Sequence, residues 1–326
     1  MRRREFITLI GNAVAAWPLA ARAQKPPPLV GFLGNQLPPP PNDPQGNALF
    51  QGFRDNGLII GRDFVFEPRF TEGDDARFPV FARELAQKNV RMILANTPAG
   101  VRAAQHLDPP VSVLMVNMHD PVGQGLVASL AHPGGHTTGT ASLNVDVTPK
   151  LLEFLREILP KARVLAVMFN PSNPSNPVMM DNLQAKATPL GIAVLPFPLR
   201  SPGDLEAVFL ALVARRPDAL QVLGDPLLSD LGDRITELAL ANRLPTFTNS
   251  ETAVEAGGLI CYGASVRKVL GRMGYYMKKV LDGANPGDLP VEQPTKLELI
   301  INLKTAKTLG IEIPPTLLAR ADQVIE

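Results

Sequence analysis

Short apolar runs alternate with amphipathic windows of helical spacing along most of this 326-residue chain. The runs are rich in residues that favour strands. They lie at 29–34, 64–67, 90–95 and 111–117 in the first half, and at 163–169, 192–196, 219–223, 245–248 and 259–262 in the second. Such alternation predicts βαβ units, so we expect an α/β protein with parallel sheets covered by helices.

A glycine-rich segment, 134–139, separates the two sets of predicted strands near the middle of the chain. It is interpreted as a hinge, with a second crossing at 284–295 and a candidate third at 258–265. We therefore expect two Rossmann-like lobes joined by a hinge. The predicted N-terminal lobe is 24–138 plus 264–295, the C-terminal lobe is 139–263, and the lobe of the segment 296–326 is left open.

Several apolar runs end in an amide or acid that is soon followed by proline. The stretches are AVMFNPSNPSNP at 166–177, ILANTP at 93–98, VLMVNMHDP at 113–121 and LQVLGDP at 220–226. Any one of these endings is more often a helix cap or a turn than a ligand contact. Open parallel sheets bind ligands beyond the carboxyl ends of their strands, however. The repetition in both halves therefore predicts a polar cleft between two hinged lobes.

The N-terminus has the features of an export signal. Arg2, Arg3 and Arg4 precede a short, weakly apolar span, and Ala21-Arg22-Ala23 is a small-x-small cleavage site. Residues 1–23 are predicted to be removed after Ala23, by a twin-arginine-like route or by the general one, which makes the protein periplasmic. The alternative is a retained amphipathic anchor.

Charge and cysteine content narrow the partners and cofactors. The formal net charge is +1, and removal of 1–23, with four arginines and one glutamate, leaves about −2, so no nucleic-acid partner is expected. The single cysteine, Cys261, excludes an internal disulfide and disfavours a thiolate metal site. His132 and His136 flank Pro-Gly-Gly, which is no helix, so no metal and no cofactor is predicted.

The sequence lacks the common catalytic motifs: it has no G-x-S-x-G, P-loop or H-E-x-x-H pattern. The segment 123–128 matches G-x-G-x-x-A, but five residues separate it from the preceding predicted strand. Its glycines are interpreted as residues that allow close packing at the start of a helix. A nucleotide-dependent α/β enzyme is kept only as an alternative function. The acids Asp120 and Asp225 are left open between binding an ammonium group and capping a helix.

Motifs spread over nearly all of 28–326 resemble one family. They are Gly31-Phe32-Leu33, Asp120-Pro121-Val122-Gly123, Pro133-Gly134-Gly135, Asn170-Pro171, Asp225-Pro226-Leu227, Glu255-Ala256-Gly257-Gly258-Leu259 and the closing run 289–326. The family is that of ABC transporter substrate-binding proteins grouped with tryptophan and tyrosine uptake components, whose fold is the type I periplasmic binding protein.

The resemblance implies an extracytoplasmic, non-enzymatic component of an ABC importer. It would capture a small polar organic solute by hinge closure, with an amino acid favoured, and deliver it to permease subunits as a monomer. A module that senses a ligand for another partner protein is the alternative. By the family's motifs, the residues expected to line the cleft are Asn35, Thr97, Asn117, Asp120, Asn170, Asp225 and Tyr262.

Two departures bear on the ligand. Where many relatives have an Arg-Glu/Asp-Phe run, this chain has Glu251-Thr252-Ala253. If that arginine binds a substrate carboxylate in the relatives, the ligand of this chain is expected to lack a carboxylate or to have it held by helix N-termini. Trp17, the one tryptophan, lies in the export segment, which weakens the case for a sugar stacked on broad aromatic faces.

Overall fold

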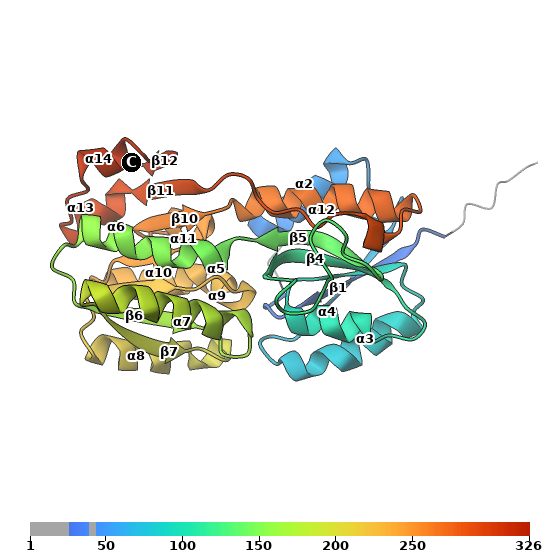
Figure 1. Cartoon of the computed structure of the whole chain (residues 1–326), viewed down its shortest axis with the longest axis horizontal. Coiled ribbons are helices and arrows are strands. Elements are labelled where there is room, and N and C mark those ends of the chain that lie inside the picture. Colours follow the sequence, from blue (N-terminus) through green and yellow to red (C-terminus); the bar gives the residue numbers. More distant parts are fainter. Residues whose placement is uncertain (1–25, 39–43) are drawn as a thin grey trace, which may run out of the picture.

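The computed structural model describes residues 26–38 and 44–326, which form two α/β lobes side by side (Figure 1). The first lobe holds a five-stranded sheet in which every neighbouring pair is parallel. In spatial order its strands are β2 (Val65–Phe70), β1 (Leu29–Gly34), β3 (Met92–Ala95), β4 (Ser112–His119) and β5 (Thr137–Ser142).

The second lobe holds a seven-stranded sheet that is parallel except between β10 and β11. Its spatial order is β12 (Gln323–Ile325), β11 (Glu298–Asn302), β10 (Ile260–Gly263), β9 (Thr246–Thr248), β8 (Ala219–Val222), β6 (Val164–Phe169) and β7 (Ala193–Pro198). Each apolar run predicted to be a strand is one, and the predicted two-lobed α/β fold is confirmed.

Helices cover both faces of the first sheet. On one face α2 (Pro44–Asp55) and α12 (Val266–Leu281) pack around Phe53, Phe64 and Tyr276. On the other, α3 (Phe78–Gln87) and α4 (Pro98–Gln105) bury a second apolar cluster. The backbones of α2 and α12 nearly touch, since a Cβ at Gly274 would lie 1.9 Å from the carbonyl oxygen of Gly52. Residues 266–281 therefore belong to the first lobe.

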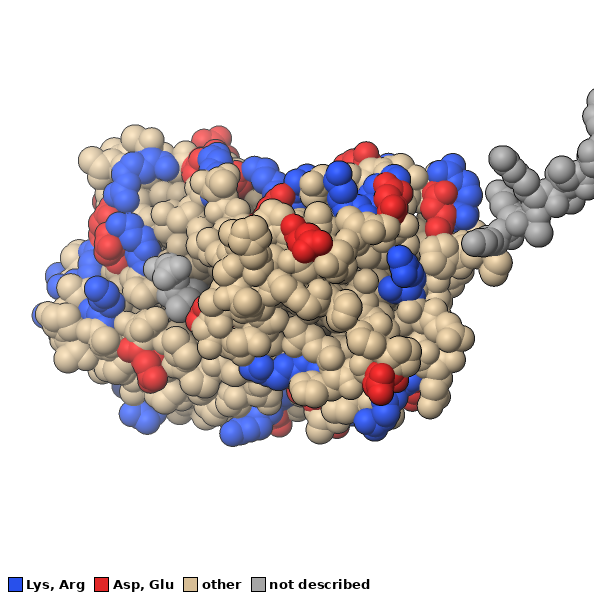
Figure 2. Space-filling model, turned by 45° about the vertical axis from the view of Figure 1, so that its right-hand side comes forward, with Lys and Arg blue, Asp and Glu red and all other residues tan. Residues whose placement is uncertain are grey.

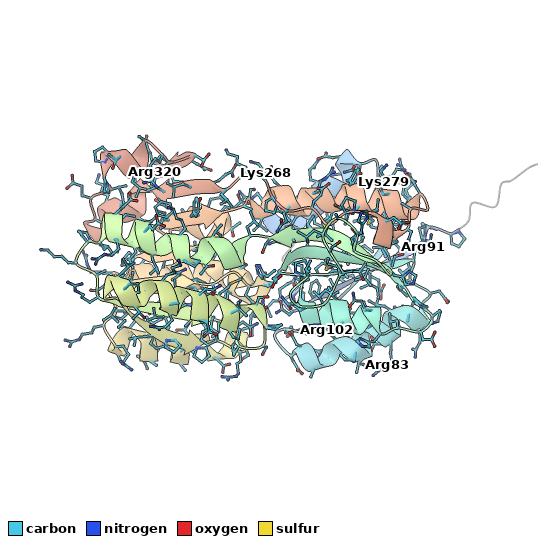
Figure 3. The ribbon with its side chains drawn as sticks, in the orientation of Figure 1. Arg83, Arg91, Arg102, Lys268, Lys279 and Arg320 are labelled. Carbon is cyan, nitrogen blue, oxygen red and sulfur yellow. The ribbon has the colours of Figure 1, made fainter. Side chains whose placement is uncertain are left out.

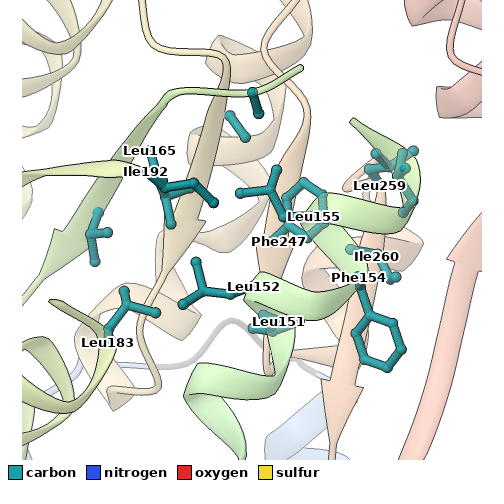
Figure 4. Packing of buried hydrophobic residues seen from close by; sticks show 14 of the residues in the cluster. Leu151, Leu152, Phe154, Leu155, Leu165, Leu183, Ile192, Phe247, Leu259 and Ile260 are labelled. Carbon is teal, nitrogen blue, oxygen red and sulfur yellow. The ribbon is translucent and has the colours of Figure 1, made fainter. Parts of the chain in front are cut away.

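The second lobe is built in the same way. Figure 4 shows α6 (Leu151–Ile158) packing its leucines against the sheet, and α7 (Ser175–Ala187) shares this cluster. The opposite face carries α8 (Leu205–Ala214) and α10 (Gly232–Ala241). The C-terminal segment joins this lobe, because β11 pairs with β10 and β12 pairs with β11. Between these two strands, α13 (Leu303–Leu309) and α14 (Pro315–Leu318) pack against the same apolar cluster as α6.

The glycine-rich segment predicted as the hinge is not where the chain crosses. Residues 137–142 form β5, the buried edge strand of the first sheet, and the chain leaves this lobe only after Ser142, through α5 (Asn144–Val147). Thr137, Thr138 and Thr140 suit a strand because they are β-branched. Gly139 has φ of +134° and lies against β4, where a Cβ would be 2.1 Å from the Met115 carbonyl oxygen. Glycine here permits close strand contact instead of bending.

Two further crossings join the lobes. One runs from β10 to α12, and the other from the 3-10 turn Pro286–Asp288 to β11 (Figure 1). Within the described parts of the chain, no helix is both long enough and apolar enough to span a bilayer. Figure 2 shows acidic and basic side chains mixed around the rim of one face, whose centre carries few charged side chains.

Candidate functional site

The strand order places a topological switch point in each lobe. In the first sheet it lies between β1 and β3, and in the second between β6 and β8, because helices leave these neighbouring strands in opposite directions. Asn35 and Asn96 follow β1 and β3, whereas Asn170 follows β6 and Asp225 comes shortly after β8. Switch points are where open α/β sheets bind ligands.

A cavity of about 90 Å³ lies between the lobes and is lined by both. The first lobe contributes Asn96, Val116, Asn117 and His119 from its sheet and Val266 and Leu270 from α12, and the crossing after β5 contributes Asn144. The second lobe contributes Val222, Leu223, Gly224, Asp225, Pro226, Leu228, Ser229, Gly232, Ile235, Thr236, Thr246, Thr248, Asn249, Ser250 and Ala253. The lining combines amides and hydroxyls with aliphatic side chains, which suits a small solute that is partly polar.

Asp225 is the one carboxylate among these lining residues, and it is 3% exposed. It begins α9 (Pro226–Asp230) and accepts from the backbone amides of Leu227 and Leu228 at 2.9 and 3.3 Å. The side-chain amides of Asn173 and Asn170 donate to it at 2.8 and 3.3 Å. Burial raises the pKa of Asp225, while these four donors act in the opposite direction. The residue therefore both caps a helix and borders the cavity.

Asn170 is buried and tied into the turn that follows β6. Its backbone amide donates to the Asn176 side chain at 2.9 Å, and its own Oδ1 accepts from the Ser172 amide at 3.0 Å. Asn173 repeats the device with the Ser175 amide at 3.1 Å. The asparagines of the NPSNPSNP stretch thus build the edge of the cleft by bonding one another and Asp225.

The lobes touch across the cleft. The Gln124 side-chain amide of the first lobe donates to the Ser175 hydroxyl of the second at 2.8 Å, and the Leu37 backbone amide donates to Asp230 at 2.8 Å. A Cβ at Gly73 would lie 2.7 Å from the Arg200 carbonyl oxygen. These contacts describe a closed arrangement of the lobes.

His119 lines the cavity from the end of β4 and is 7% exposed. Its Nδ1 makes a short contact with the Ser142 hydroxyl. Burial lowers the pKa of His119 to about 4, against a smaller opposite effect of the Gly224 carbonyl across the cleft. The ring is therefore neutral near pH 7 and adds no positive charge to the cavity.

The other predicted site residues have varied positions. Asn117 lines the cavity and has a φ of +53°, and its backbone amide donates to the Thr140 hydroxyl at 2.9 Å. Thr97 is buried as the cap of α4, accepting from the Gly100 amide at 3.1 Å. Asp120 is exposed and accepts from the Gly123 amide at 2.9 Å, which makes it a turn residue.

Tyr262 does not lie among the residues that line the cavity. Its ring packs edge-on against Phe154 at 5.1 Å, within the apolar cluster under α6. This packing turns the Tyr262 side chain toward α6, and a contact of Tyr262 with the ligand stays a prediction. Asn35, in contrast, is fully buried at the end of β1, and both polar atoms of its side chain lack a hydrogen-bond partner.

Residues 121–125 form consecutive turns instead of the predicted helix. The Leu126 amide donates to the Pro121 carbonyl at 2.8 Å, and Gly125 has φ of +66°. This segment therefore has no helix N-terminus that could receive a nucleotide phosphate.

Glu251, at the position of the missing arginine, is turned away from the cavity lining. It accepts from the Ser265 hydroxyl at 3.2 Å and from the Arg267 amide at 3.1 Å, which ties α11 (Glu251–Glu255) to the start of α12. The described lining of the cavity includes no lysine or arginine. Figure 3 shows Arg83 and Arg91 on the first lobe and Lys268 at a crossing, and none of these borders the cavity.

Sequence reasoning missed several cavity residues. They are Asn96, His119, Asn144, Thr246, Thr248, Asn249 and Ser250. Asn96 and Asn249 come directly after strands, as Asn35 does. Asn96 also lies in the same NTP segment as Thr97, so a choice of polar residues directly after strands would have included it. Among residues 26–38 and 44–326, no group of His, Cys, Asp and Glu is arranged to hold a metal ion.

Comparison with known proteins gives the family. A tyrosine-binding protein of Clostridioides difficile is 26% identical over 274 residues, which cover 84% of this chain and 78% of that protein. The fold matches an ABC domain in complex with L-Trp from Streptococcus pneumonia, with TM-score 0.78 and 22% identity over 91% of this chain and 100% of the other.

A conserved domain protein from Vibrio cholerae has TM-score 0.78 and 25% identity, over 91% of this chain and 99% of the other. A ligand-free, open substrate-binding protein with adhesive properties from Clostridium difficile has TM-score 0.59 and 25% identity over the same shares. The model of the family "ABC transporter substrate binding protein" matches residues 41–325. This chain belongs to that family of substrate-binding proteins and has the type I periplasmic binding protein fold.

Proposed function

We propose that this protein is the extracytoplasmic solute-binding component of an ABC importer. It captures a small organic solute that carries an amine, with an amino acid favoured, between its two lobes. Closure about the crossings then presents the loaded protein to permease subunits, with no chemical step.

The observation that carries the proposal is an inter-lobe cavity at two facing switch points, with polar groups from both lobes. A cavity that both lobes line is assembled only when they come together, so a solute that contacts both favours closure. The Gln124–Ser175 and Leu37–Asp230 hydrogen bonds are the contacts that closure would make.

The relatives support the same assignment. The tyrosine-binding protein and the L-Trp complex concern aromatic amino acids, and the fold is nearer to the L-Trp complex than to the ligand-free, open protein. The described lining of this cavity includes no Phe, Tyr or Trp, however. An aliphatic or polar amine therefore fits the lining better than a solute that needs ring stacking.

Export by the segment 1–23, which lies outside the described residues, is part of the proposal. Its arginines and its Ala21-Arg22-Ala23 site would carry the protein to the periplasm, where importers collect solutes. Mass spectrometry of the protein from a periplasmic extract should give an N-terminus at Gln24. An intact N-terminus in the membrane fraction would favour the anchor instead.

A thermal-shift screen of the purified protein tests the binding function. A solute that binds only the folded protein stabilises it by about 2.7 kcal/mol at 100 times its Kd, which raises the Tm by about 4 °C for a chain of this size. Amino acids and amines should shift the Tm, whereas sugars and nucleotides should not. A folded protein whose Tm responds to none of these solutes would contradict the proposal.

A permease is distinguished from another protein partner by reconstitution. ATP hydrolysis by a candidate partner ABC transporter, reconstituted in vesicles, is expected to need the solute-loaded protein. Loaded protein that leaves that ATPase unstimulated but binds a receptor domain would favour the sensing alternative.

A further inference from the structure

Unpaired polar atoms gather at the carboxyl edge of the first sheet. Six buried side-chain oxygen or nitrogen atoms of the described residues lack a hydrogen bond, and five of them belong to Asn35, Thr71, Asp75 and Asn96. Such atoms are rare in folded proteins because each has lost its water without gaining a partner. Their concentration at a switch point indicates that a bound group supplies the missing partners.

Asn35 and Thr71 point to the same side. They extend the parallel pairing of β1 and β2, in which Leu33 stands opposite Arg69 and Gly34 opposite Phe70. The Gly73 amide donates to the Asn35 carbonyl at 2.8 Å, which keeps the two segments adjacent. Both side chains are at most 1% exposed. Like Leu33, which packs under α3, they face the helix side of the sheet, toward the turn that begins at Asp75.

Asp75 completes this group. The Thr71 hydroxyl lies close enough to Asp75 to lower the pKa of its carboxyl. Neither Thr71 Oγ1 nor Asp75 Oδ1, however, makes a hydrogen bond of normal geometry. Burial, together with the charges of Asp225 and Asp74, raises the pKa of Asp75 to about 7. The start of α9 lies against this turn, because a Cβ at Gly73 would be 3.5 Å from Leu227 Cδ2, and Asp225 caps the same end of α9.

Cations are near but are used elsewhere. Arg77 donates to the Thr71 carbonyl oxygen at 3.3 Å and lies 4.7 Å over the Phe81 ring. On its outer side Asp75 borders a groove lined by Arg83, Arg102 and His106, and Arg102 donates to the Gln124 carbonyl at 3.1 Å. In the part of the chain that the structure describes, no ion pair joins Asp75 to any of them.

The donors and acceptors identify the missing partner. Asp75, Thr71 and the Asn35 amide oxygen offer acceptors, and Asp225 adds a buried negative charge from the other lobe. Two carboxylates would repel an anion, whereas a primary ammonium carries three donors and a compensating charge. We propose that Asn35, Thr71 and Asp75 of the first lobe, with Asp225 of the second, form the subsite for the ligand's ammonium group.

This assignment rests on the proposed solute-binding function and adds a pH dependence to it. The ammonium group binds the ionised form of Asp75, so ligand binding releases a proton from the fraction that is protonated near pH 7. Below that pH the affinity falls by about tenfold per pH unit, as linkage of one proton requires.

Matched solutes test the subsite by isothermal titration calorimetry. We would titrate L-leucine against 4-methylpentanoate, L-tyrosine against 3-(4-hydroxyphenyl)propionate and L-tryptophan against indole-3-propionate, from pH 5 to 8. The amino acid of a binding pair should be at least 100-fold tighter than its deaminated partner, with the linked loss of affinity at low pH.

Variants locate the effect. Asp75→Asn should lower the affinity for the amino acid at least tenfold and remove its pH dependence. Thr71→Val should lower the affinity several-fold. The control, Asp74→Asn, removes the neighbouring exposed charge and should change the affinity less than twofold. The Tm of each variant shows whether it is folded.

Each outcome decides one question. Equal affinity for a deaminated partner, or undiminished binding by Asp75→Asn, would overturn the ammonium subsite while leaving solute binding intact. Absence of binding by every amine, acid and sugar would overturn the proposed function and the subsite with it.

Discussion

The two edges that face the cleft use the same residue types but differ in hydrogen bonding. At the second-lobe edge, Asn170, Asn173 and Asp225 bond one another and the start of α9. At the first-lobe edge, Asn35 and Thr71 are equally buried, yet their polar side-chain atoms have no partner. The second-lobe edge is therefore a finished scaffold, whereas the first-lobe edge is completed by something it binds.

The largest expected effect lies in the finished edge. Asp225→Ala removes the acceptor of four donors, leaving buried amides unpaired, so the free energy of unfolding should fall by about 2–4 kcal/mol. Urea unfolding measures this. Asp204→Ala is the control, because Asp204 caps an exposed turn through Ser201 and should cost at most about 1 kcal/mol. Equal losses for the two variants would mean that the network around Asp225 adds nothing.

The next effect is a pH dependence at the unfinished edge. The pKa of Asp75 is raised to about 7 in the folded protein, so the folded state holds this proton more tightly than the unfolded state. That contribution is complete below the unfolded pKa near 3.9 and is lost as the pH rises through about 7. The stability of wild type relative to Asp75→Asn should thus fall by roughly 1–3 kcal/mol between pH 4 and 8, after allowance for screening of a half-buried group.

Urea unfolding of both proteins across this range, without ligand, provides the measurement. Asp74→Asn serves as the control: it keeps the Asp75 carboxyl and should keep the fall in stability, at a slightly lower pH because the charge of Asp74 contributes to the raised pKa of Asp75. Parallel curves for wild type and Asp75→Asn would show that the Asp75 carboxyl is well solvated.

A smaller effect of opposite sign is expected at Asn35. Because both polar atoms of its side chain are unpaired, Asn35→Leu removes a desolvation cost at similar volume and should stabilise the unliganded protein by about 1 kcal/mol. The matched variant Asn170→Leu breaks satisfied bonds and should destabilise it. Chemical unfolding of the pair is a direct comparison of the edges, and a loss of stability in both would contradict the difference drawn here.

Much of the fold could be predicted because hydrophobic periodicity is local. Runs such as 163–169 and 219–223 are strands, and the stripe from Val266 is α12. The strand β5 was missed because its glycine indicates a turn when TTGTAS is considered alone. The structure shows that Gly139 instead allows close contact with the Met115 backbone of β4. The lobe of β11 and β12 depends on pairing with β10, which no local pattern encodes.

The site was harder to predict because function there depends on direction. Asn117 and Asp225 line the cavity, since strand ends meet at one edge of a sheet, and Asn35 is buried at the end of β1. The sequence could not show that Tyr262 turns into the core. Asp75 lies five residues after the end of β2 in an ordinary-looking TEGDD turn, and only the folded protein shows the burial and the neighbouring charges of Asp225 and Asp74 that raise its pKa.

The smallest expected effect concerns the contact that joins the edges. Ser175→Ala removes the acceptor of the Gln124 amide in the closed arrangement, but that amide keeps its bond to the His119 carbonyl at 2.7 Å. Closure should therefore weaken by only about 0.5 kcal/mol, seen as about a twofold rise in the Kd of an amino acid found by the thermal screen. Small-angle scattering should also show a slightly larger radius of gyration without ligand. Ser172→Ala, on the exposed side of the same turn, should change neither quantity. If Ser175→Ala also leaves both unchanged, closure is held by the ligand and the Leu37–Asp230 contact, and the two edges meet only through what they bind.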